Sequence, residues 1–205
     1  MKKNRISKNW INKQRRDIYI RKSKIEGYRS RAAYKLEEIN KKFKILRNGF
    51  KIIDLGAAPG SWSQYLSRNV KNSKILAIDI KEVESLKNIF FIKGNFTDKK
   101  KQEQIKEYFG DQVDVIVSDM AVNTTGNKNI DSIVTGELCI EALNFSKNIL
   151  KTNGQFVSKI FMGSSFNEII LTAKTIFKET HVFKPQSSRK ESKESFLVCK
   201  NLLTV

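Results

Sequence analysis

Short apolar runs alternate along the chain with segments whose apolar residues recur at helical spacing. Seven apolar runs predict β-strands, at residues 50–54, 75–80, 89–93, 113–118, 155–161, 181–184 and 195–199. Helical spacing predicts helices at residues 32–39, 61–67, 98–109, 130–150 and 166–177. This alternation indicates an α/β fold, a doubly wound and mostly parallel sheet with helices on both faces.

The last two predicted strands are connected differently from the others. Residues 185–194 form a polar link that is too short for a crossover helix. We therefore expect a seven-stranded sheet whose last two strands pair as a C-terminal antiparallel hairpin.

The residues that directly follow the strands are the candidates for ligand binding, because ligands of such sheets lie beyond the carboxyl ends of the strands. They are Asp54 with the turn that follows it, Asp79, residues 94–96, Asp119 with residues 120–126, and Lys159 at the end of its strand. Asp119 and Lys159 adjoin apolar strands, where an unpaired charge is costly to bury. Solvated surface positions remain the alternative for isolated charges in so charged a chain.

A turn of small residues, DLGAAPGSW at residues 54–62, follows the first predicted strand. Glycine and alanine at a strand-to-helix junction let the backbone approach a ligand closely, although such turns also occur as plain structure. Asp79 follows at about the spacing at which an acidic residue holds a ribose diol. The Gly-x-Gly-x-x-Gly spacing of dinucleotide-binding proteins is absent, which argues against a nicotinamide dehydrogenase.

Length and composition suit a single globular domain with an appended segment. The chain has 205 residues, 40% of them hydrophobic, and no apolar run approaches the roughly 20 residues of a membrane helix. The N-terminus does not resemble a secretory signal, so we expect a cytoplasmic protein. Cys139, Cys199 and His181 stand far apart, which predicts neither a disulfide nor a metal site.

The net charge of +18 implies a polyanionic partner, with nucleic acid the first candidate, although an AT-rich genome would also enrich lysine. Residues 1–31 hold twelve basic residues against two acidic ones. Trp10, Tyr19 and Tyr28 lie among them and either stack on unpaired bases or pack on the domain. We expect residues 1–28 to form a basic RNA-binding arm and residues 29–205 a catalytic domain.

Four further motifs carry charged residues in the order Lys35 (RSRAAYKL), Asp119 (SDMA), Lys159 (VSKIF) and Glu194 (SKES). Together with the glycine turn and the KPQSSR segment at residues 184–189, they resemble the RrmJ/FtsJ (RlmE) family of ribosomal RNA large subunit 2′-O-methyltransferases. The likeness runs from about Trp10 to Lys200. It implies a Rossmann-like S-adenosylmethionine-dependent methyltransferase fold with a Lys-Asp-Lys-Glu tetrad around the site of methyl transfer.

The tetrad suits this reaction because the sulfonium of S-adenosylmethionine is an activated methyl donor, so that catalysis needs alignment and the removal of one proton. Lys159 is our candidate general base. A buried amine beside a second cation such as Lys35 gives up its proton more easily, whereas Asp119 and Glu194 would oppose this and orient the amines. Alternatively, Lys159 mainly steers the substrate or stabilises the developing alkoxide. No metal is required.

The resemblance also assigns the cofactor pocket, with Asp54, Gly56 and Asp119 among the contacts. It places Gly60 and Trp62 beside the methionine, Asp79 on the ribose and Asn95 on the adenine. Two positions depart from the family, which usually has aspartate at Asn95 and a second glycine at Ser61. A third departure, Val122 in place of a proline, precedes the loop of residues 123–126.

The resemblance implies methylation of a uridine ribose in the A loop of 23S ribosomal RNA, within the assembled large ribosomal subunit. A transfer RNA 2′-O-methyltransferase of the same superfamily and a catalytically silent RNA-binding assembly factor are the alternatives. The intact tetrad disfavours the silent factor. The strong positive charge favours a monomer that finds its partner in RNA.

Overall fold

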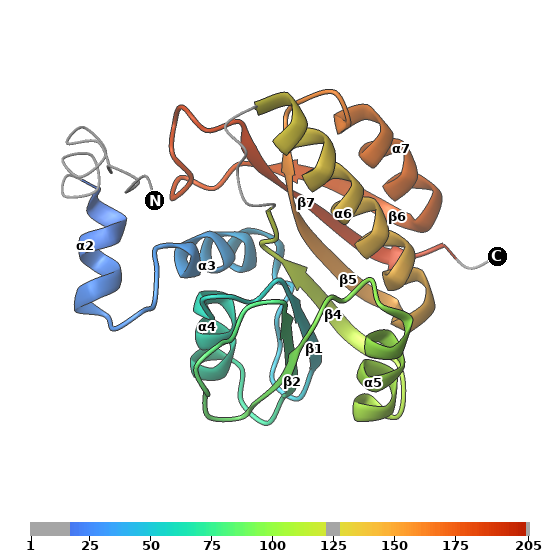
Figure 1. Cartoon of the computed structure of the whole chain (residues 1–205), viewed down its shortest axis with the longest axis horizontal. Helices are drawn as coiled ribbons and strands as arrows, with labels where there is room; N and C mark the ends of the chain where they lie inside the picture. The colour runs from blue at the N-terminus through green and yellow to red at the C-terminus, as the bar shows by residue number, and fades with distance from the viewer. Residues whose placement is uncertain (1–16, 122–127, 204–205) are drawn as a thin grey trace, which may run out of the picture.

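The computed structural model describes residues 17–121 and 128–203, with the side chains of residues 128–131 excepted. Its strands form one seven-stranded sheet in the order β3-β2-β1-β4-β5-β7-β6 (Figure 1). The strands are β1 (Lys51–Leu55), β2 (Lys74–Asp79), β3 (Ile89–Lys93), β4 (Val113–Ser118), β5 (Leu150–Phe161), β6 (Phe177–Phe183) and β7 (Glu194–Leu202).

Strands β1 to β5 pair in parallel, whereas β7 runs antiparallel to both of its neighbours, β5 and β6. The predicted mostly parallel sheet with a C-terminal antiparallel hairpin is therefore confirmed. The structure adds that β7 enters between β5 and β6, which leaves β6 at the edge. The sixth strand begins at Phe177, four residues before the predicted start.

Helices cover both faces of the sheet, as Figure 1 shows. They are α2 (Ile18–Ile25), α3 (Ala32–Phe43), α4 (Ser61–Asn69), α5 (Lys99–Phe109), α6 (Lys128–Ile149) and α7 (Phe166–Ile176). Successive side chains of a strand point to opposite faces, so a strand contributes side chains to the apolar layer on each face of the sheet. In β1, Ile53 packs with residues of α5, α6 and α7, whereas Ile52 packs with residues of α3 and α4.

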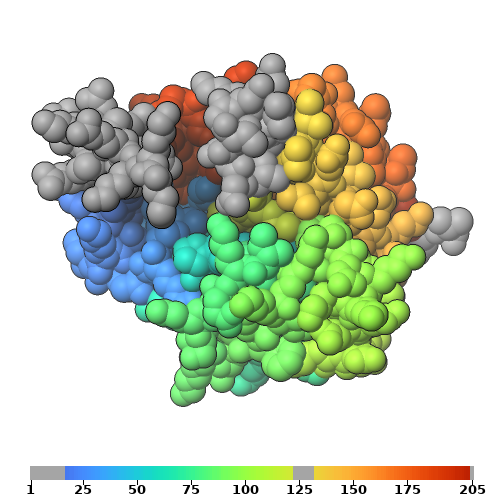
Figure 2. All heavy atoms as spheres, in the orientation of Figure 1, coloured from blue at the N-terminus to red at the C-terminus, as the bar shows by residue number. Residues whose placement is uncertain are grey.

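Residues 17–31, the described part of the segment before α3, pack against the rest of the domain. Helix α2 begins behind Asp17, whose carboxylate accepts hydrogen bonds from the amides of Tyr19 and Ile20. The rings of Tyr19 and Tyr28 both contact Tyr34 of α3, at centroid distances of 5.6 and 5.7 Å. Figure 2 shows this segment in blue at one side of the molecule. The two tyrosines therefore pack, while Trp10 lies outside the described residues.

Strand β1 pairs with β2 on one side and β4 on the other, so the strand order reverses there. Crossovers leave in opposite directions at such a switch point and open a crevice at the carboxyl ends of the strands. The turn after β1 and the residues that follow β2 and β4 meet at this crevice.

Candidate active site

The four charged residues expected around the reaction come from four elements and lie together. Lys35 projects from α3, Asp119 directly follows β4, Lys159 lies on β5 and Glu194 begins β7. The Nζ of Lys35 is 2.8 Å from Glu194 Oε2 and 3.7 Å from Asp119 Oδ1. The Nζ of Lys159 is 2.9 Å from that same Asp119 oxygen. The side chains thus form a continuous row of alternating charge.

Burial makes the charges of this row depend on one another. None of the four side chains is more than 17% exposed. Burial opposes the ionisation of Asp119, but Lys159 and Lys35 hold the pKa of its carboxyl below the ordinary value. Burial also favours the neutral amine of Lys35, yet Asp119 and Glu194 hold its pKa above the ordinary value. Asp119 and Lys35 are therefore both ionised at neutral pH.

Asp119 holds Lys159 at two points. The lysine Nζ donates to the backbone oxygen of Asp119 at 2.7 Å and to its carboxylate at 2.9 Å. An amine has two hydrogens and a lone pair, and an ammonium group has three hydrogens, so in either state this arrangement leaves one further position on Nζ for a ligand oxygen. On the far side of the row, Ser188 Oγ donates to Glu194 Oε1 at 2.7 Å, which fixes that carboxylate.

The turn after β1 requires glycine at two points. Gly56 has φ +72°, and a Cβ there would come within 2.1 Å of Met120 Cγ. Gly60 has φ +101° and precedes the first residue of α4. A Cβ at Gly60 would lie 2.3 Å from Arg29 Nη1, because the Arg29 guanidinium donates to Pro59 O and Glu84 O.

Ser61, where the family usually has a second glycine, begins helix α4 and is buried. Its Oγ lies 2.7 Å from Ser30 Oγ, close enough for a hydrogen bond in either direction. The serine therefore adds a link between the turn and the segment before α3.

Asp54 lies at the end of β1 and is 1% exposed. Burial raises the pKa of its carboxyl to about 7, although a hydrogen bond from Ser63 Oγ, 2.6 Å long, opposes the rise. The carboxylate thus faces α4, and its bond to Ser63 fixes the start of that helix relative to the strand.

A cavity of about 450 Å³ opens beside the tetrad at the crevice of the sheet. Four of the predicted cofactor residues line it, namely Gly56, Asp79, Asn95 and Asp119. Asp119 belongs to both sites, so the cavity adjoins the charged row directly. Its mixture of a carboxylate, an amide and apolar surface fits a nucleoside, since a ribose diol needs acceptors and an adenine needs a flat apolar slot.

The polar groups of this cavity are held by the backbone. Asp79 accepts hydrogen bonds from the amides of Ala58 at 2.9 Å and Lys81 at 2.8 Å. Asn95 Oδ1 accepts one from the amide of Thr97 at 3.1 Å, which directs its NH₂ group away from that turn. Carboxylate oxygens accept more than one bond each, so Asp79 retains capacity for a ribose.

Three predicted cofactor residues, Asp54, Gly60 and Trp62, do not line the cavity. Trp62 is 2% exposed, donates from Nε1 to Ala32 O at 2.8 Å and packs against Phe196. In this structure Trp62 ties α4 to α3, and Asp54 and Gly60 shape the turn. Direct contact of the three with a cofactor stays a prediction.

Met120, one of the residues after β4 that we expected near a ligand, also lines the cavity. Sequence analysis missed Leu138, which lines it too, and the role of Arg29. Leu138 lies within α6, where nothing local marks it. Arg29 entered the sequence analysis only as one of the basic residues of the N-terminal segment. Its guanidinium instead donates hydrogen bonds that hold the turn after β1 in place.

Within residues 17–121 and 128–203, no cluster of three His, Cys, Asp or Glu side chains could hold a metal ion. No helix of that part of the chain is long and apolar enough to cross a membrane.

A Rossmann-like sheet with an antiparallel β7 between β5 and β6, a glycine turn after β1 and a polar cavity at the switch point are the features of the methyltransferase class. Residues 28–202 match the model of the FtsJ-like methyltransferase family. The chain belongs to that family, as its motifs predicted.

Individual relatives agree with this assignment. The chain is 65% identical to ribosomal RNA large subunit methyltransferase E of Pelagibacter ubique, over 98% of this chain and all of that protein. It is 45% identical to the Rickettsia akari protein of the same name, over 95% of this chain and 88% of that one.

Solved structures give the same picture. A ribosomal RNA methyltransferase from Plasmodium falciparum superposes with a TM-score of 0.76 at 34% identity, covering 87% of this chain and all of that one. A Streptococcus mutans methyltransferase, solved with S-adenosylhomocysteine (SAH), has a TM-score of 0.52 at 13% identity, covering 78% and 90%, and so shares the fold.

Proposed function

We propose that this chain transfers a methyl group from S-adenosylmethionine to the 2′-hydroxyl of a uridine ribose in the A loop of 23S ribosomal RNA, within the assembled large subunit. The substrate class is supported by the relatives named ribosomal RNA large subunit methyltransferase E. The observation that carries the chemistry is the Lys159–Asp119–Lys35–Glu194 row beside the cavity.

The residues that line the cavity have the chemistry needed to bind the cofactor. Asp79 would hold the ribose, Asn95 the adenine, and Gly56 would allow close approach of the backbone. When bound, S-adenosylmethionine supplies an activated methyl group, so the protein needs to align the acceptor and take up one proton.

Lys159 is the proposed general base. Its neutral amine would take up the proton of the substrate 2′-hydroxyl as that oxygen accepted the methyl group that bound S-adenosylmethionine would supply. Asp119 positions Lys159 by accepting hydrogen bonds from its Nζ at the backbone oxygen and at Oδ1. Lys35 remains charged between Asp119 and Glu194 and so fixes the row of side chains, and its charge also stabilises the developing alkoxide.

Replacing the proposed base tests this assignment. Lys159→Ala should lower the rate of methyl transfer by about 10²- to 10⁴-fold, the usual contribution of a general base, while the dissociation constants for cofactor and RNA stay near those of the wild type. Lys174→Ala, an exposed lysine on α7, is the matched control. Retained transfer by Lys159→Ala would refute the role of this lysine as base.

The substrate is tested by offering methyl-labelled cofactor to large ribosomal subunits, naked 23S RNA and transfer RNA side by side. We expect label on a uridine 2′-oxygen of the subunit, identified by nucleoside analysis. Label on transfer RNA alone would favour the transfer RNA methyltransferase, and binding without any label would favour the silent assembly factor. The proposal also includes that the enzyme is monomeric and cytoplasmic and that residues 1–28 contact the RNA.

A further inference from the structure

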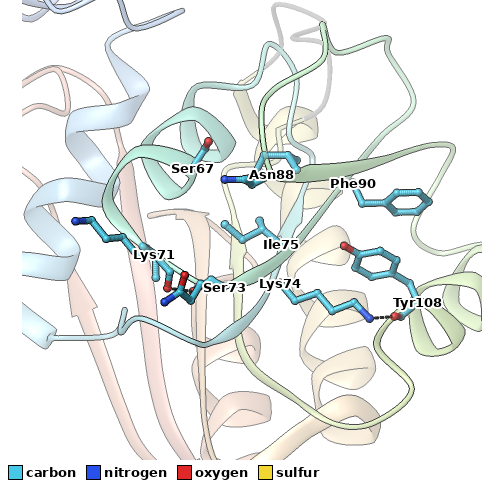
Figure 3. Close-up of a pocket in the computed structure, with 11 residues that line it drawn as sticks. Ser67, Lys71, Ser73, Lys74, Ile75, Asn88, Phe90 and Tyr108 are labelled. Carbon is cyan, nitrogen blue, oxygen red and sulfur yellow. Dashed lines mark hydrogen bonds between the residues drawn. The ribbon is translucent and has the colours of Figure 1, made fainter.

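A second cavity, of about 750 Å³, lies at the starts of β2 and β3, at the other end of the strands from the cofactor cavity. Figure 3 shows the residues that line it. It is bounded by the start of β2, the start of β3 and the end of α5. Its polar lining consists of Lys71 and Lys74 with hydroxyl and amide side chains from Ser67, Asn72, Ser73 and Asn88. None of its eleven lining residues is acidic, so the cavity attracts anions.

An aromatic stack forms one wall of this cavity. The ring of Phe90 stacks on that of Tyr108, with centroids 4.5 Å apart and an interplanar angle of 9°. The Lys74 Nζ lies 4.4 Å from the Tyr108 centroid and also donates to the Tyr108 backbone oxygen, a bond drawn in Figure 3. Phe90 is nevertheless 47% exposed. Because Tyr108 covers one face of the Phe90 ring, the exposure falls on the opposite face and the edges.

We infer that this cavity is a second RNA contact, in which an unpaired base stacks on Phe90 while the neighbouring phosphates lie near Lys71 and Lys74. Base–aromatic stacking beside cationic side chains is the usual way in which proteins hold single-stranded RNA without reading its sequence. The inference rests on the proposed function in one respect, that the substrate is RNA.

The position of the cavity indicates which part of the RNA it holds. Strand β2 begins with Lys74 at this cavity and ends with Asp79 at the cofactor cavity. Five residue steps in a strand span about 17 Å. The bound base is therefore a different nucleotide from the one methylated, and Phe90 contributes to the affinity for the substrate and not to the chemical step.

RNA fits this surface better than a protein partner does. The chain carries a net charge of +18, and the lining of the cavity includes two lysines and no carboxylate. The competing occupant is a second copy of the chain, because β3 lies at the edge of the sheet and presents unpaired backbone groups. Two positively charged copies repel each other, which disfavours that pairing.

The test compares Phe90→Ala with Leu171→Ala, a matched loss of an exposed apolar side chain on α7. Binding of labelled oligouridine and of a 23S RNA transcript is measured by fluorescence anisotropy, together with the cofactor dissociation constant and the melting temperature. Phe90→Ala should weaken binding of both RNAs by about 5- to 100-fold, with kcat for methyl transfer unchanged and KM raised. Phe90→Trp should restore affinity, and Leu171→Ala should have no effect.

A double change of Lys71 and Lys74 to glutamine should lower the slope of log affinity against log salt by about 1.4 units, as expected for two lost phosphate contacts on a single strand. RNA affinity of Phe90→Ala equal to that of Leu171→Ala would overturn the inference. A shift in sedimentation of Phe90→Ala with unchanged RNA binding would assign the surface to a second copy and overturn it too. Phe90-dependent binding without methyl transfer would support the RNA contact and refute the proposed reaction.

Discussion

At the residue scale, Asp54 couples the stability of the fold to pH. The folded state binds the Asp54 proton more tightly than the unfolded chain, whose aspartates titrate near 3.9. The contribution of this group to stability therefore falls as pH rises from about 4 to about 7 and is constant above that window. Integrated over three pKa units, the loss amounts to about 4 kcal/mol.

The variant Asp54→Asn should remove this dependence. The difference in free energy of unfolding, variant minus wild type, should rise between pH 5 and pH 8, measured by urea denaturation without cofactor. Asp111→Asn is the control, because this exposed carboxyl has a pKa lowered by the Gln112 amide and Lys51, so its titration lies below the window. A flat difference for Asp54→Asn would mean that the carboxyl is ionised throughout.

Asn95 supports a second prediction at this scale. Its Oδ1 accepts one hydrogen bond from the Thr97 amide and has one lone pair left for an adenine amine, since the NH₂ group only donates. An aspartate there would keep the turn and offer a charged second oxygen, a stronger acceptor for an adenine amine. Asn95→Asp should therefore tighten S-adenosylmethionine binding about tenfold, measured by calorimetry. Unchanged affinity would show that the adenine lies elsewhere.

How far the site could be predicted depends on what each residue contacts. Asp119 and Lys159 were found because a charge at the end of an apolar strand needs a partner, and they became partners of each other. Lys35 and Glu194 came from the family motifs alone, since nothing local separates them from the other charges of so basic a chain. Leu138 was not predictable, because its place in the cavity depends on how α6 packs over the sheet.

At the element scale, α2 shows where periodicity fails. Its apolar residues lie at positions 18, 19, 20 and 25, which do not recur at i, i+3 and i+4, and only Ser23 is buried. Asp17 compensates, since it caps the helix and pairs with Arg31 and Arg189. Strands β1, β4 and β7 were easier to predict because consecutive residues in them are buried on both faces. The insertion of β7 between β5 and β6, in contrast, depends on pairings between distant segments.

Substitutions of Asp17 separate the helix cap from the ion pairs. Asp17→Ala removes both and should destabilise α2 by about 0.5–2 kcal/mol, seen as faster amide hydrogen exchange over residues 18–25. Asp17→Asn keeps the cap and loses the charge, so α2 exchange should stay close to that of the wild type. Equal acceleration in both variants would show that the ion pairs, not the cap, hold the helix.

At the scale of the whole molecule, the sheet separates the two proposed RNA contacts. The tetrad and the cofactor cavity lie at the carboxyl ends of the strands, and the Phe90 cavity lies at the other end. Residues 17–28 pack on the body through Tyr19, Tyr28 and the Arg68 bonds to Glu26 and Gly27. Removing the entire segment 1–28 would therefore disturb α2 as well as the charge.

A deletion confined to residues 1–16 tests the arm more cleanly, because it leaves the Asp17 cap and α2 in place. These residues hold seven basic side chains and no acidic one. If they contact phosphates, the deletion should lower the salt slope of RNA binding by up to about six units. The affinity for S-adenosylmethionine should not change, because the cofactor cavity is formed by residues of the body. The measurement is RNA affinity between 50 and 200 mM salt, about the range over which such contacts are lost. An unchanged slope would place the phosphate contacts on the body and leave the arm without a role in binding RNA.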